Sequence, residues 1–323
     1  MVDARELMGV ILAAGRGTRM LPFSERWPKP CLPIAGKPLL RYQLDALRDL
    51  GVRDVVVVIG HLGYEVVRSL GEGEDLGLRL RYVEQGDALG IAHAVAKLES
   101  RVTRPFFLFL GDIFFETENL GKMREVFDGE RVCGVLAVKR EPDLEKIKRN
   151  FVVVAGKDGL VTRVIEKPRH PRTDVKGCGL YLFDLSFFDA IRRTPRTAMR
   201  DEYEITDSIQ IFIDDGYGVA AEEVVKEDLN LSYPHDLLAV NLHVLDRMKV
   251  PSLVGKGVRL AEGTVVDRSV LMDGVVVEAP IRIRDSLVFP DQVVTRTADL
   301  ERTILLPGHE IDCRNSIPAR DGR

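Results

Sequence analysis

The apolar residues in the first two-thirds of the chain follow two alternating patterns. Short continuous runs, Val10–Leu12, Val55–Ile59 and Phe106–Leu110, predict strands that are buried on both faces. Between them apolar residues recur at helical spacing, as they do over 39–50 and 92–98. This alternation of strand and helix predicts an α/β protein with a doubly wound, mainly parallel sheet. Such a sheet binds its ligands at the carboxyl ends of the strands.

The chain becomes richer in strand patterns after residue 130. Apolar, β-branched segments at 133–138, 151–154, 161–165 and 179–183 predict strands that extend the sheet and form a wall of its site. Two further helices are predicted. One follows Thr206 and Asp207, either of which suits the N-cap position, and one runs from about Pro234 to Met248 with proline in its first turn.

Past Pro251 the pattern changes to a six-residue repeat of apolar residues, at Val265, Leu271, Val277, Ile283 and Phe289. A longer repeat of seventeen residues starts at Ser269, Ser286 and Thr303. Six residues for each flat face and three faces for each coil are typical of a parallel β-helix, and they fit an antiparallel hairpin domain less well. We therefore predict two domains, 1–249 and 250–323. The second is a short module of three or four coils, whose ends need a cap or a partner chain.

Composition narrows the functional classes. The 323 residues are 45% hydrophobic and 30% charged, as in an ordinary soluble globular protein, and the net charge of −4 argues against nucleic acid as a partner. We expect no membrane span and no apolar signal region before the first strand, hence a cytoplasmic protein. Four scattered cysteines lack the spacing of metal ligands and are expected to be reduced.

The candidate chemistry starts at the glycine loop that follows the first strand. Gly15-Arg16-Gly17-Thr18-Arg19 allows backbone N–H groups to approach an anion, and Arg19 and Lys29 add the cations that a triphosphate needs. Lys29 lies between two prolines, which restrict its backbone. A dinucleotide fingerprint is excluded because Met20 replaces its third glycine, and a P-loop is excluded because no Gly-Lys-Ser/Thr follows.

Together with five further motifs, this loop resembles the sugar-1-phosphate nucleotidyltransferases, the nucleotide-sugar pyrophosphorylases. The resemblance covers nearly the whole chain. The matching segments are Leu12–Met20, Pro28-Lys29-Pro30, Glu84-Gln85 with Leu89–Ala94, Leu110-Gly111-Asp112, Ile165–Pro168 and Glu204–Asp207. A short C-terminal left-handed β-helix also occurs in several branches of the family. The implied fold is therefore the Rossmann-like nucleotidyltransferase fold followed by such a β-helix.

The resemblance implies that a sugar-1-phosphate attacks the α-phosphorus of a nucleoside triphosphate. Arg19 and Lys29 would then be the catalytic residues, with Arg16 secondary because it occupies a variable position of the family. The nucleotide would contact the residues Leu12, Ala13, Gly15, Arg16, Gly17, Thr18, Gln85 and Gly90. The sugar phosphate would contact Glu166, Lys167 and Gly179.

Magnesium is the implied cofactor. Asp112 follows a buried strand and offers a hard carboxylate, which suits Mg²⁺. Asn230 aligns with a second metal-binding aspartate of the family, and related N-acetylglucosamine-phosphate uridylyltransferases have asparagine there. Asp228, two residues earlier, competes for this role.

The substrate pair stays open at this point. The segment from Leu89 to Ala94 resembles the uridylyl and thymidylyl branches, which favours UTP or dTTP with glucose-1-phosphate. Phe151, where many members have glycine, would alter the sugar pocket. Alternatives are a mannose-1-phosphate guanylyltransferase, a non-catalytic regulatory or assembly relative, and a bifunctional enzyme that also acetylates amino sugars, for which the coils are too few. We expect a homo-oligomer that forms through the β-helix.

Overall fold

The computed structural model describes residues 6–198 and 201–317. The segment before residue 6, where no apolar signal region is expected, lies outside these residues. The described chain forms two units: residues 6–16 and 40–228 make up unit 1, and residues 17–39 and 229–317 make up unit 2. The glycine loop therefore leaves unit 1 after Arg16, and residues 17–39 belong with the C-terminal part of the chain. The boundary predicted at residue 249 rests on the change of sequence pattern past Pro251 and stays a prediction.

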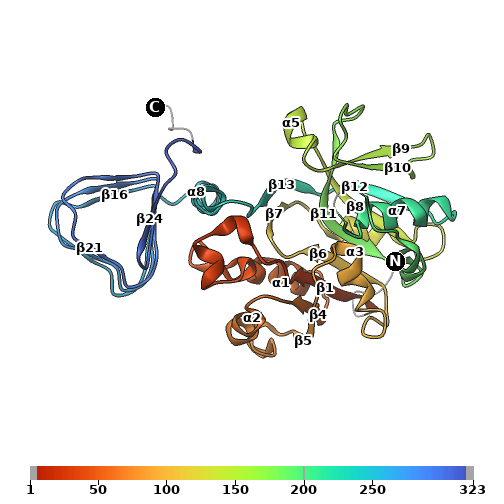
Figure 1. Ribbon diagram of the computed structural model, residues 1–323, viewed down its shortest axis with the longest axis horizontal. Helices are drawn as coiled ribbons and strands as arrows, with labels where there is room; N and C mark the ends of the chain where they lie inside the picture. Colours follow the sequence, from red (N-terminus) through yellow and green to blue (C-terminus); the bar gives the residue numbers. More distant parts are fainter. Residues whose placement is uncertain (1–5, 199–200, 318–323) are drawn as a thin grey trace. The chain divides into compact units, whose positions relative to one another are not determined.

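Unit 1 is built on one large sheet. Its path is β10-β9-β11-β6-β1-β4-β5, with β8 pairing β11 and β12 pairing β8 (Figure 1). The four strands β6, β1, β4 and β5 are parallel, as predicted. Strand β11 joins β6 in the antiparallel sense, so the strand-rich segment after residue 130 does extend the sheet. The strands are β1 (Met8–Ala13), β4 (Asp54–Ile59), β5 (Arg79–Glu84), β6 (Phe106–Leu110), β7 (Ile113–Thr117), β8 (Gly134–Arg140), β9 (Phe151–Ala155), β10 (Val161–Glu166), β11 (Val175–Phe183), β12 (Val219–Glu223) and β13 (Val225–Asn230).

Helices cover both faces of the sheet, which explains why its central strands are apolar throughout. On one face, β1, β4 and β6 share a core cluster with α3, α6 and α7. On the other, Leu47 of α1 packs directly against Gly9 of β1, where an added Cβ would lie 2.7 Å from Leu47 Cδ1. The helices are α1 (Leu39–Asp49), α2 (Gly63–Leu70), α3 (Ile91–Ala96), α4 (Gly121–Val126), α5 (Leu144–Ile147), α6 (Phe187–Arg193) and α7 (Ile205–Asp214).

The predicted start of helix α7 is wrong. Its N-cap residue is Glu204, and Thr206 and Asp207 lie within the first turn. Thr206 is 3% exposed, and its hydroxyl faces Oε2 of Glu166 at 3.5 Å. A Thr or Asp pattern marks possible caps, but the burial of Thr206 places the helix start before it.

Unit 2 joins the loop segment 17–39 to a helix and a β-helix. The loop carries the short strands β2 (Pro33–Ile34) and β3 (Lys37–Pro38), and the helix is α8 (Pro234–Met248), close to its predicted bounds. The side chain of Asn241, fully buried in α8, accepts a hydrogen bond from Ala35 N at 2.8 Å and donates to Pro33 O at 3.0 Å. On the β-helix, Phe289 packs against Phe23 and Trp27, with ring centroids 5.5 and 5.2 Å apart. The loop is thus fixed to both C-terminal elements.

The β-helix is confirmed, and it consists of three coils of parallel strands followed by a hairpin. The register gives three inward columns, Val254–Leu271–Val288, Leu260–Val277–Val294 and Val266–Ile283–Leu300. One coil contains seventeen residues rather than eighteen. Positions spaced strictly six residues apart therefore point to the interior for only one coil and then fall outside it. Val265 is consequently exposed, and Phe289 points out to meet the loop. The strands are β14 (Leu253–Val254), β15 (Arg259–Leu260), β16 (Val265–Asp267), β17 (Val270–Leu271), β18 (Val276–Val277), β19 (Arg282–Arg284), β20 (Leu287–Val288), β21 (Val293–Val294), β22 (Leu300–Glu301), β23 (Thr303–Leu306) and β24 (His309–Asp312).

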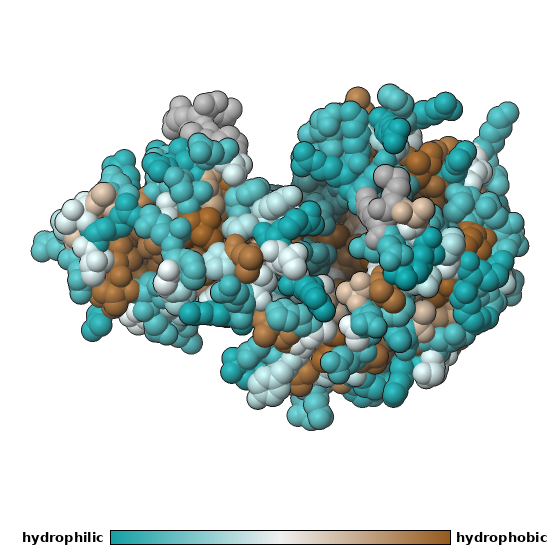
Figure 2. All heavy atoms as spheres, viewed as in Figure 1, coloured by the Kyte–Doolittle hydropathy of each residue, from teal (hydrophilic) through white to brown (hydrophobic). Residues whose placement is uncertain are grey.

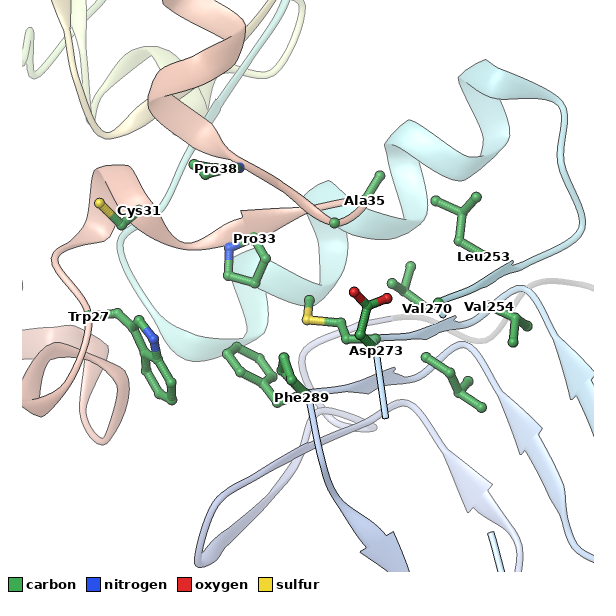
Figure 3. A pocket seen from close by; sticks show the side chains of 15 residues that line it. Trp27, Cys31, Pro33, Ala35, Pro38, Leu253, Val254, Val270, Asp273 and Phe289 are labelled. Carbon is green, nitrogen blue, oxygen red and sulfur yellow. The ribbon is translucent and has the colours of Figure 1, made fainter. Parts of the chain in front are cut away.

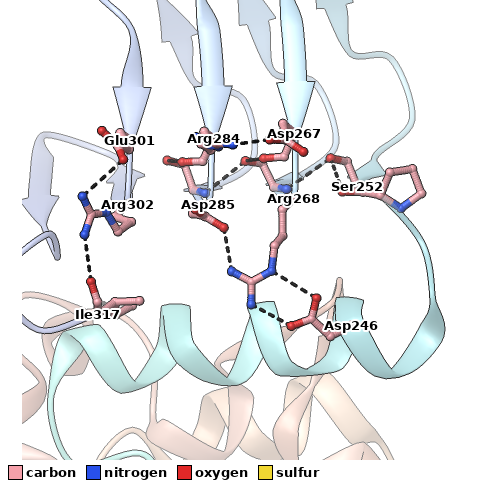
Figure 4. A network of polar contacts seen from close by, with 12 residues as sticks. Asp246, Ser252, Asp267, Arg268, Arg284, Asp285, Glu301, Arg302 and Ile317 are labelled. Carbon is pink, nitrogen blue, oxygen red and sulfur yellow. Dashed lines mark hydrogen bonds and ion pairs between the residues drawn. The ribbon is translucent and has the colours of Figure 1, made fainter. Parts of the chain in front are cut away.

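The seventeen-residue repeat has a structural cause at one corner of the coils. Ser252, Ser269 and Ser286 each accept, through the hydroxyl oxygen, the backbone N–H seventeen residues later, at 3.0–3.2 Å. The residues before each corner, Arg268, Asp285 and Arg302, adopt positive φ. Beside this ladder the guanidinium of Arg268 binds Asp246 of α8 and Asp285 of the next coil (Figure 4). Hydroxyls and ion pairs therefore set the spacing of the coils.

The hydrogen bonds from backbone N–H groups to the serine hydroxyls of the preceding coil yield a stability prediction. Replacing Ser286 by alanine leaves the buried N–H of Thr303 without its acceptor, which should lower the free energy of unfolding by about 2 kcal/mol. Ser286→Thr is the matched control, since threonine already occupies the equivalent position 303, and it should stay within about 1 kcal/mol of the native protein. Chemical denaturation measures both. Equal stability of the alanine and threonine variants would show that the ladder contributes nothing.

Candidate functional site

The carboxyl ends of three neighbouring parallel strands meet at one edge of unit 1. In the register, Leu12 of β1 lies opposite Leu110 of β6, and Ala13 lies opposite Ile59 of β4. The N–H of Gln85, the residue after β5, donates to Ile59 O at 2.9 Å. The start of the glycine loop, the buried Gln85 and the Gly111-Asp112 turn are therefore brought together, as the sequence predicted.

Asp112 is held in place by its neighbours. The N–H of Gly111 donates to Leu12 O at 2.9 Å, and a Cβ on Gly111 would lie 2.6 Å from that oxygen. From α1, the side-chain amide of Gln43 donates to Leu110 O and Ile113 O, at 2.8 Å each. Gln43 is 2% exposed and clamps the turn on both sides of Asp112. Sequence reasoning missed it, and a glutamine among the apolar positions of a helix is the signal that could have found it.

Gly90 lies where two backbone segments touch. Tyr203 N donates to Leu89 O at 2.8 Å, and Tyr203 O accepts from Ala92 N at 3.0 Å. A Cβ on Gly90, which has φ of 110°, would lie 2.6 Å from Tyr203 O. The need for glycine here is thus explained by this close approach, and Tyr203 becomes a neighbour of the predicted base site.

A second group of polar residues gathers at the end of β10. Glu166 Oε1 lies 3.4 Å from Lys167 Nζ, and its Oε2 lies 3.5 Å from Thr206 Oγ1 of α7. Lys167 has positive φ, and its N–H donates to Asn150 O at 2.7 Å, which turns the chain at this point. A carboxylate, an ammonium and a hydroxyl can together bind the hydroxyls and the phosphate of a sugar phosphate.

The packing of neighbouring side chains explains the residue types at Phe151 and Gly179, the two positions considered for the sugar pocket. The Phe151 ring is 6% exposed, stacks on Tyr181 with centroids 6.3 Å apart, and fills the space over Gly177, where a Cβ would lie 1.9 Å from its Cζ. Beside Gly179, at φ of 70°, the side chains of Leu110 and Ile113 take the space that a side chain would need. Room for a sugar ring at Gly179 stays a prediction.

Among the remaining predicted residues, Gly15 and Arg16 belong to unit 1, and the others belong to unit 2. Gly17 adopts φ of 65°, and the aliphatic stem of Lys29 packs over it. Arg19, in the short helical turn Thr18–Met20, places its guanidinium carbon 5.3 Å from the ring centre of Tyr233. Tyr233 precedes α8, three residues after Asn230, and its N–H donates to the Asp236 carboxylate at 2.7 Å. Unit 2 thus brings Arg19 to the segment that carries Asn230, a contact that the sequence pattern did not reveal.

Asp228 is unsuited to a metal. Its side chain is 1% exposed and bonds to Lys176 Nζ at 2.7 Å, with Lys139 Nζ at 3.8 Å. Burial raises the pKa of this carboxyl, and the two ammonium groups lower it in part. A carboxylate that pairs with the buried Lys176 is not available as a ligand without leaving that lysine unpaired, whereas Lys139 also pairs with Glu227 at 2.8 Å.

Asp112 and Asn230 offer the oxygen donors that fit a hard divalent cation. Both side chains are half-buried. Among the described residues no group of three or more His, Cys, Asp or Glu side chains is arranged to hold a metal. Mg²⁺ commonly takes one or two protein carboxylates and completes its shell with substrate phosphates and water.

Two further sequence expectations can be compared with the structure. None of the four cysteines is paired with another, and burial raises the pKa of the Cys133, Cys178 and Cys313 thiols. No helix in the described part of the chain has the length and apolar character to cross a membrane.

Comparison with known proteins gives two family matches. The family model described as nucleotidyl transferase matches residues 8–229. A model described as the GlmU-like C-terminal hexapeptide matches residues 241–319. The two models together span nearly all of the described chain.

Individual relatives of the chain are named as nucleotidyltransferases that act on glucose-1-phosphate. A glucose-1-phosphate thymidylyltransferase from Streptomyces griseus is 32% identical over 330 residues, which cover 97% of this chain and 91% of that protein. The UTP–glucose-1-phosphate uridylyltransferase AglF of Haloferax volcanii is 34% identical over 230 residues, 71% of this chain and 93% of that protein. A solved structure assigned as a glucose-1-phosphate thymidylyltransferase from Bacillus anthracis has a TM-score of 0.66 and 26% identity, and covers 74% of this chain and 96% of its own.

Proposed function

Because the chain belongs to the nucleotidyl transferase family, we propose that it joins a nucleoside triphosphate and a sugar-1-phosphate into a nucleotide sugar, with release of pyrophosphate. The observation that carries this function is the edge of unit 1 where β1, β4 and β6 end. There the glycine loop begins, Gln85 lies buried, and Asp112 is fixed by Gln43 and Gly111. The proteins with related names are thymidylyl- and uridylyltransferases for glucose-1-phosphate, which supports this reaction class.

The reaction is an in-line displacement at phosphorus. An oxygen of the sugar phosphate forms a bond to the α-phosphorus, and the bond from that phosphorus to the oxygen bridging the β-phosphate breaks. The pyrophosphate leaves with the bonding electrons. Such a step asks the protein to align two charged groups and to stabilise the charge that develops on them.

The cations of the glycine loop segment suit the phosphate groups. Lys29 is held by two prolines and packs on Gly17, so its ammonium can neutralise the α-phosphate and the incoming phosphate. Arg19 can stabilise the departing pyrophosphate, with Arg16 in a secondary role. The N–H groups from Gly15 to Thr18 can cradle the triphosphate, next to Leu12 and Ala13 at the end of β1.

The substrate pair that we favour is UTP or dTTP with glucose-1-phosphate. Gln85 can pair with the edge of a pyrimidine. The proposed contact of the base with Gly90 would be to its backbone, because Tyr203 O fills the space of a Cβ. On the sugar side Glu166 can accept hydrogen bonds from hydroxyl groups, and Lys167 can reach the phosphate. The pyrimidine nucleotides named for the relatives agree with this choice.

A divalent metal, which we propose to be Mg²⁺, would be held by Asp112 and the amide oxygen of Asn230. When bound, it would offset the negative charge of the triphosphate. The burial of Asp228 and its bond to Lys176 support Asn230 as the second ligand.

The reaction is tested by pyrophosphate release. A panel of five nucleoside triphosphates against glucose-, mannose-, galactose- and N-acetylglucosamine-1-phosphates should give the highest turnover with UTP or dTTP and glucose-1-phosphate, and EDTA should stop it. Lys29→Ala and Asp112→Ala should each lower turnover about 100-fold or more, because the first removes a cation that faces the reacting phosphates and the second removes the carboxylate that would hold the metal.

The exposed neighbour Arg26 provides the control for these variants. Arg26→Ala removes a cation three residues before Lys29 and should keep the native turnover. Full turnover in either the Lys29 or the Asp112 variant would refute the mechanism. A native protein that is folded but inactive with the whole panel would favour the non-catalytic relative.

The metal ligand has its own test. Asn230→Asp adds a negative charge to the donor set, so the Mg²⁺ concentration for half-maximal turnover should fall on the order of tenfold. The matched variant Asp228→Asn should leave that concentration unchanged but lower the free energy of unfolding by about 3 kcal/mol, because the buried Lys176 loses its counter-charge. If Asp228→Asn changed the Mg²⁺ concentration for half-maximal turnover and Asn230→Asp did not, the metal would be assigned to Asp228.

We also propose that copies of the chain associate through the open end of the β-helix. Its first coil has no coil before it, so the inward residue Leu260 is 40% exposed, whereas Val277 above it is buried. Figure 2 shows hydrophobic residues on the surface of the β-helix. An apolar end with unpaired strand edges is a favourable surface for a second copy.

Sedimentation velocity tests this association. The native protein should sediment as an oligomer, and Leu260→Asp should sediment as a single copy, because a charge replaces an apolar contact. Val293→Asp is the control: Val293 is equally apolar and 56% exposed, but it lies on the third coil and should leave the oligomer intact. A monomeric native protein would refute the proposal.

A further inference from the structure

Unit 2 contains a cavity of about 450 Å³ between the loop segment and the β-helix. Trp27 and Cys31 line it from the loop, and Val254, Met272 and Phe289 line it from the first three coils (Figure 3). Its volume lies in the range of sites that bind small molecules. Neither the family matches nor the proposed reaction assigns it a ligand.

The walls of this cavity are preformed. Phe289 is 1% exposed and holds Trp27 by a ring contact, while Asn241 fixes the backbone at Pro33 and Ala35 on the opposite side. A ligand would therefore meet a site that needs little ordering, which reduces the entropic cost of binding. Because the lining is aromatic and aliphatic, an apolar ring is the body that fits it.

One lining residue carries a charge. Asp273 is exposed, and Figure 3 shows its carboxylate between the loop and the strands. Its Oδ1 accepts the N–H of Lys256 at 2.7 Å, which fixes the side chain. No ion pair to Asp273 is recorded within residues 6–198 and 201–317. A ligand with an ammonium group would supply that counter-charge in a charge-assisted hydrogen bond.

We propose that this cavity is a binding site for a small molecule with an apolar ring and one ammonium group on a short chain. The proposal goes beyond the nucleotidyl transfer reaction and does not depend on it. The cavity supplies the ring site, and Asp273 selects for the cation.

The protein contains its own reporter for this site, because Trp27 is the single tryptophan of the chain. We use 2-phenylethylamine as the probe and titrate it against Trp27 fluorescence. The expected result is a saturable change with a Kd on the order of 1 mM, as the small size of the probe dictates. The neutral analogue 2-phenylethanol should bind about fivefold more weakly, which is the effect of one exposed charge pair.

Cys31 gives a second readout that is independent of fluorescence. It is half-buried, whereas the other three cysteines are buried, so iodoacetamide should modify it first. Saturating 2-phenylethylamine should slow this modification at least about twofold, since probe and reagent then compete for one space. Mass spectrometry of the Cys31 peptide follows the rate.

Two variants separate the charge from the cavity. Asp273→Asn keeps an oxygen for the Lys256 N–H and should lose the preference for the amine over the alcohol. Val254→Phe fills the cavity from an exposed position and should abolish binding of both compounds, with the thermal unfolding midpoint and the basal turnover unchanged.

Three results would overturn the proposal. The first is no saturable change in Trp27 fluorescence with 2-phenylethylamine. The second is equal affinity of the native protein for the amine and the alcohol. The third is unaltered binding in Val254→Phe. The inactivity of the protein as a nucleotidyl transferase would leave all three measurements, and therefore the proposal, unaffected.

Discussion

The pairing of β1 with β4 on one side and β6 on the other is the constraint on which the rest of unit 1 depends. Parallel strands in register end together, so the residues after Ala13, Ile59 and Leu110 share one edge. That edge tolerates no side chain at Gly111, because its backbone touches Leu12 O. The position of Asp112 therefore follows from backbone hydrogen bonds and close packing. Gln43 secures the turn on both sides of Asp112 through hydrogen bonds that span 67 and 70 residues.

The loop that carries Arg19 and Lys29 has a different support. It leaves unit 1 after Arg16 and is fixed by Asn241 of α8 and by Phe289 of the β-helix. The C-terminal module is thus more than an appended surface for association. It provides the apolar anchor for the segment with the proposed catalytic cations, and the same contact forms one wall of the cavity beside Asp273.

Burial decides between residues that a sequence motif treats alike. Asp228 and Asn230 lie two residues apart, and both carry oxygen donors. Because Asp228 is enclosed with Lys176 and Lys139, its charge is used inside the protein, whereas Asn230 is half-buried and uncharged. Similarly, Phe151 is explained by the space over Gly177, where no other side chain could lie.

Much of the protein could be predicted from local patterns, because they report which faces are buried. The apolar runs determined the parallel strands, and the repeat at Ser269, Ser286 and Thr303 determined the coils. What remained hidden were contacts between residues distant in sequence. The role of Gln43, the contact of Arg19 with Tyr233, and the anchoring of Trp27 by Phe289 were decided only by the tertiary structure. Periodicity identifies a buried face, but it does not identify which distant segment covers that face.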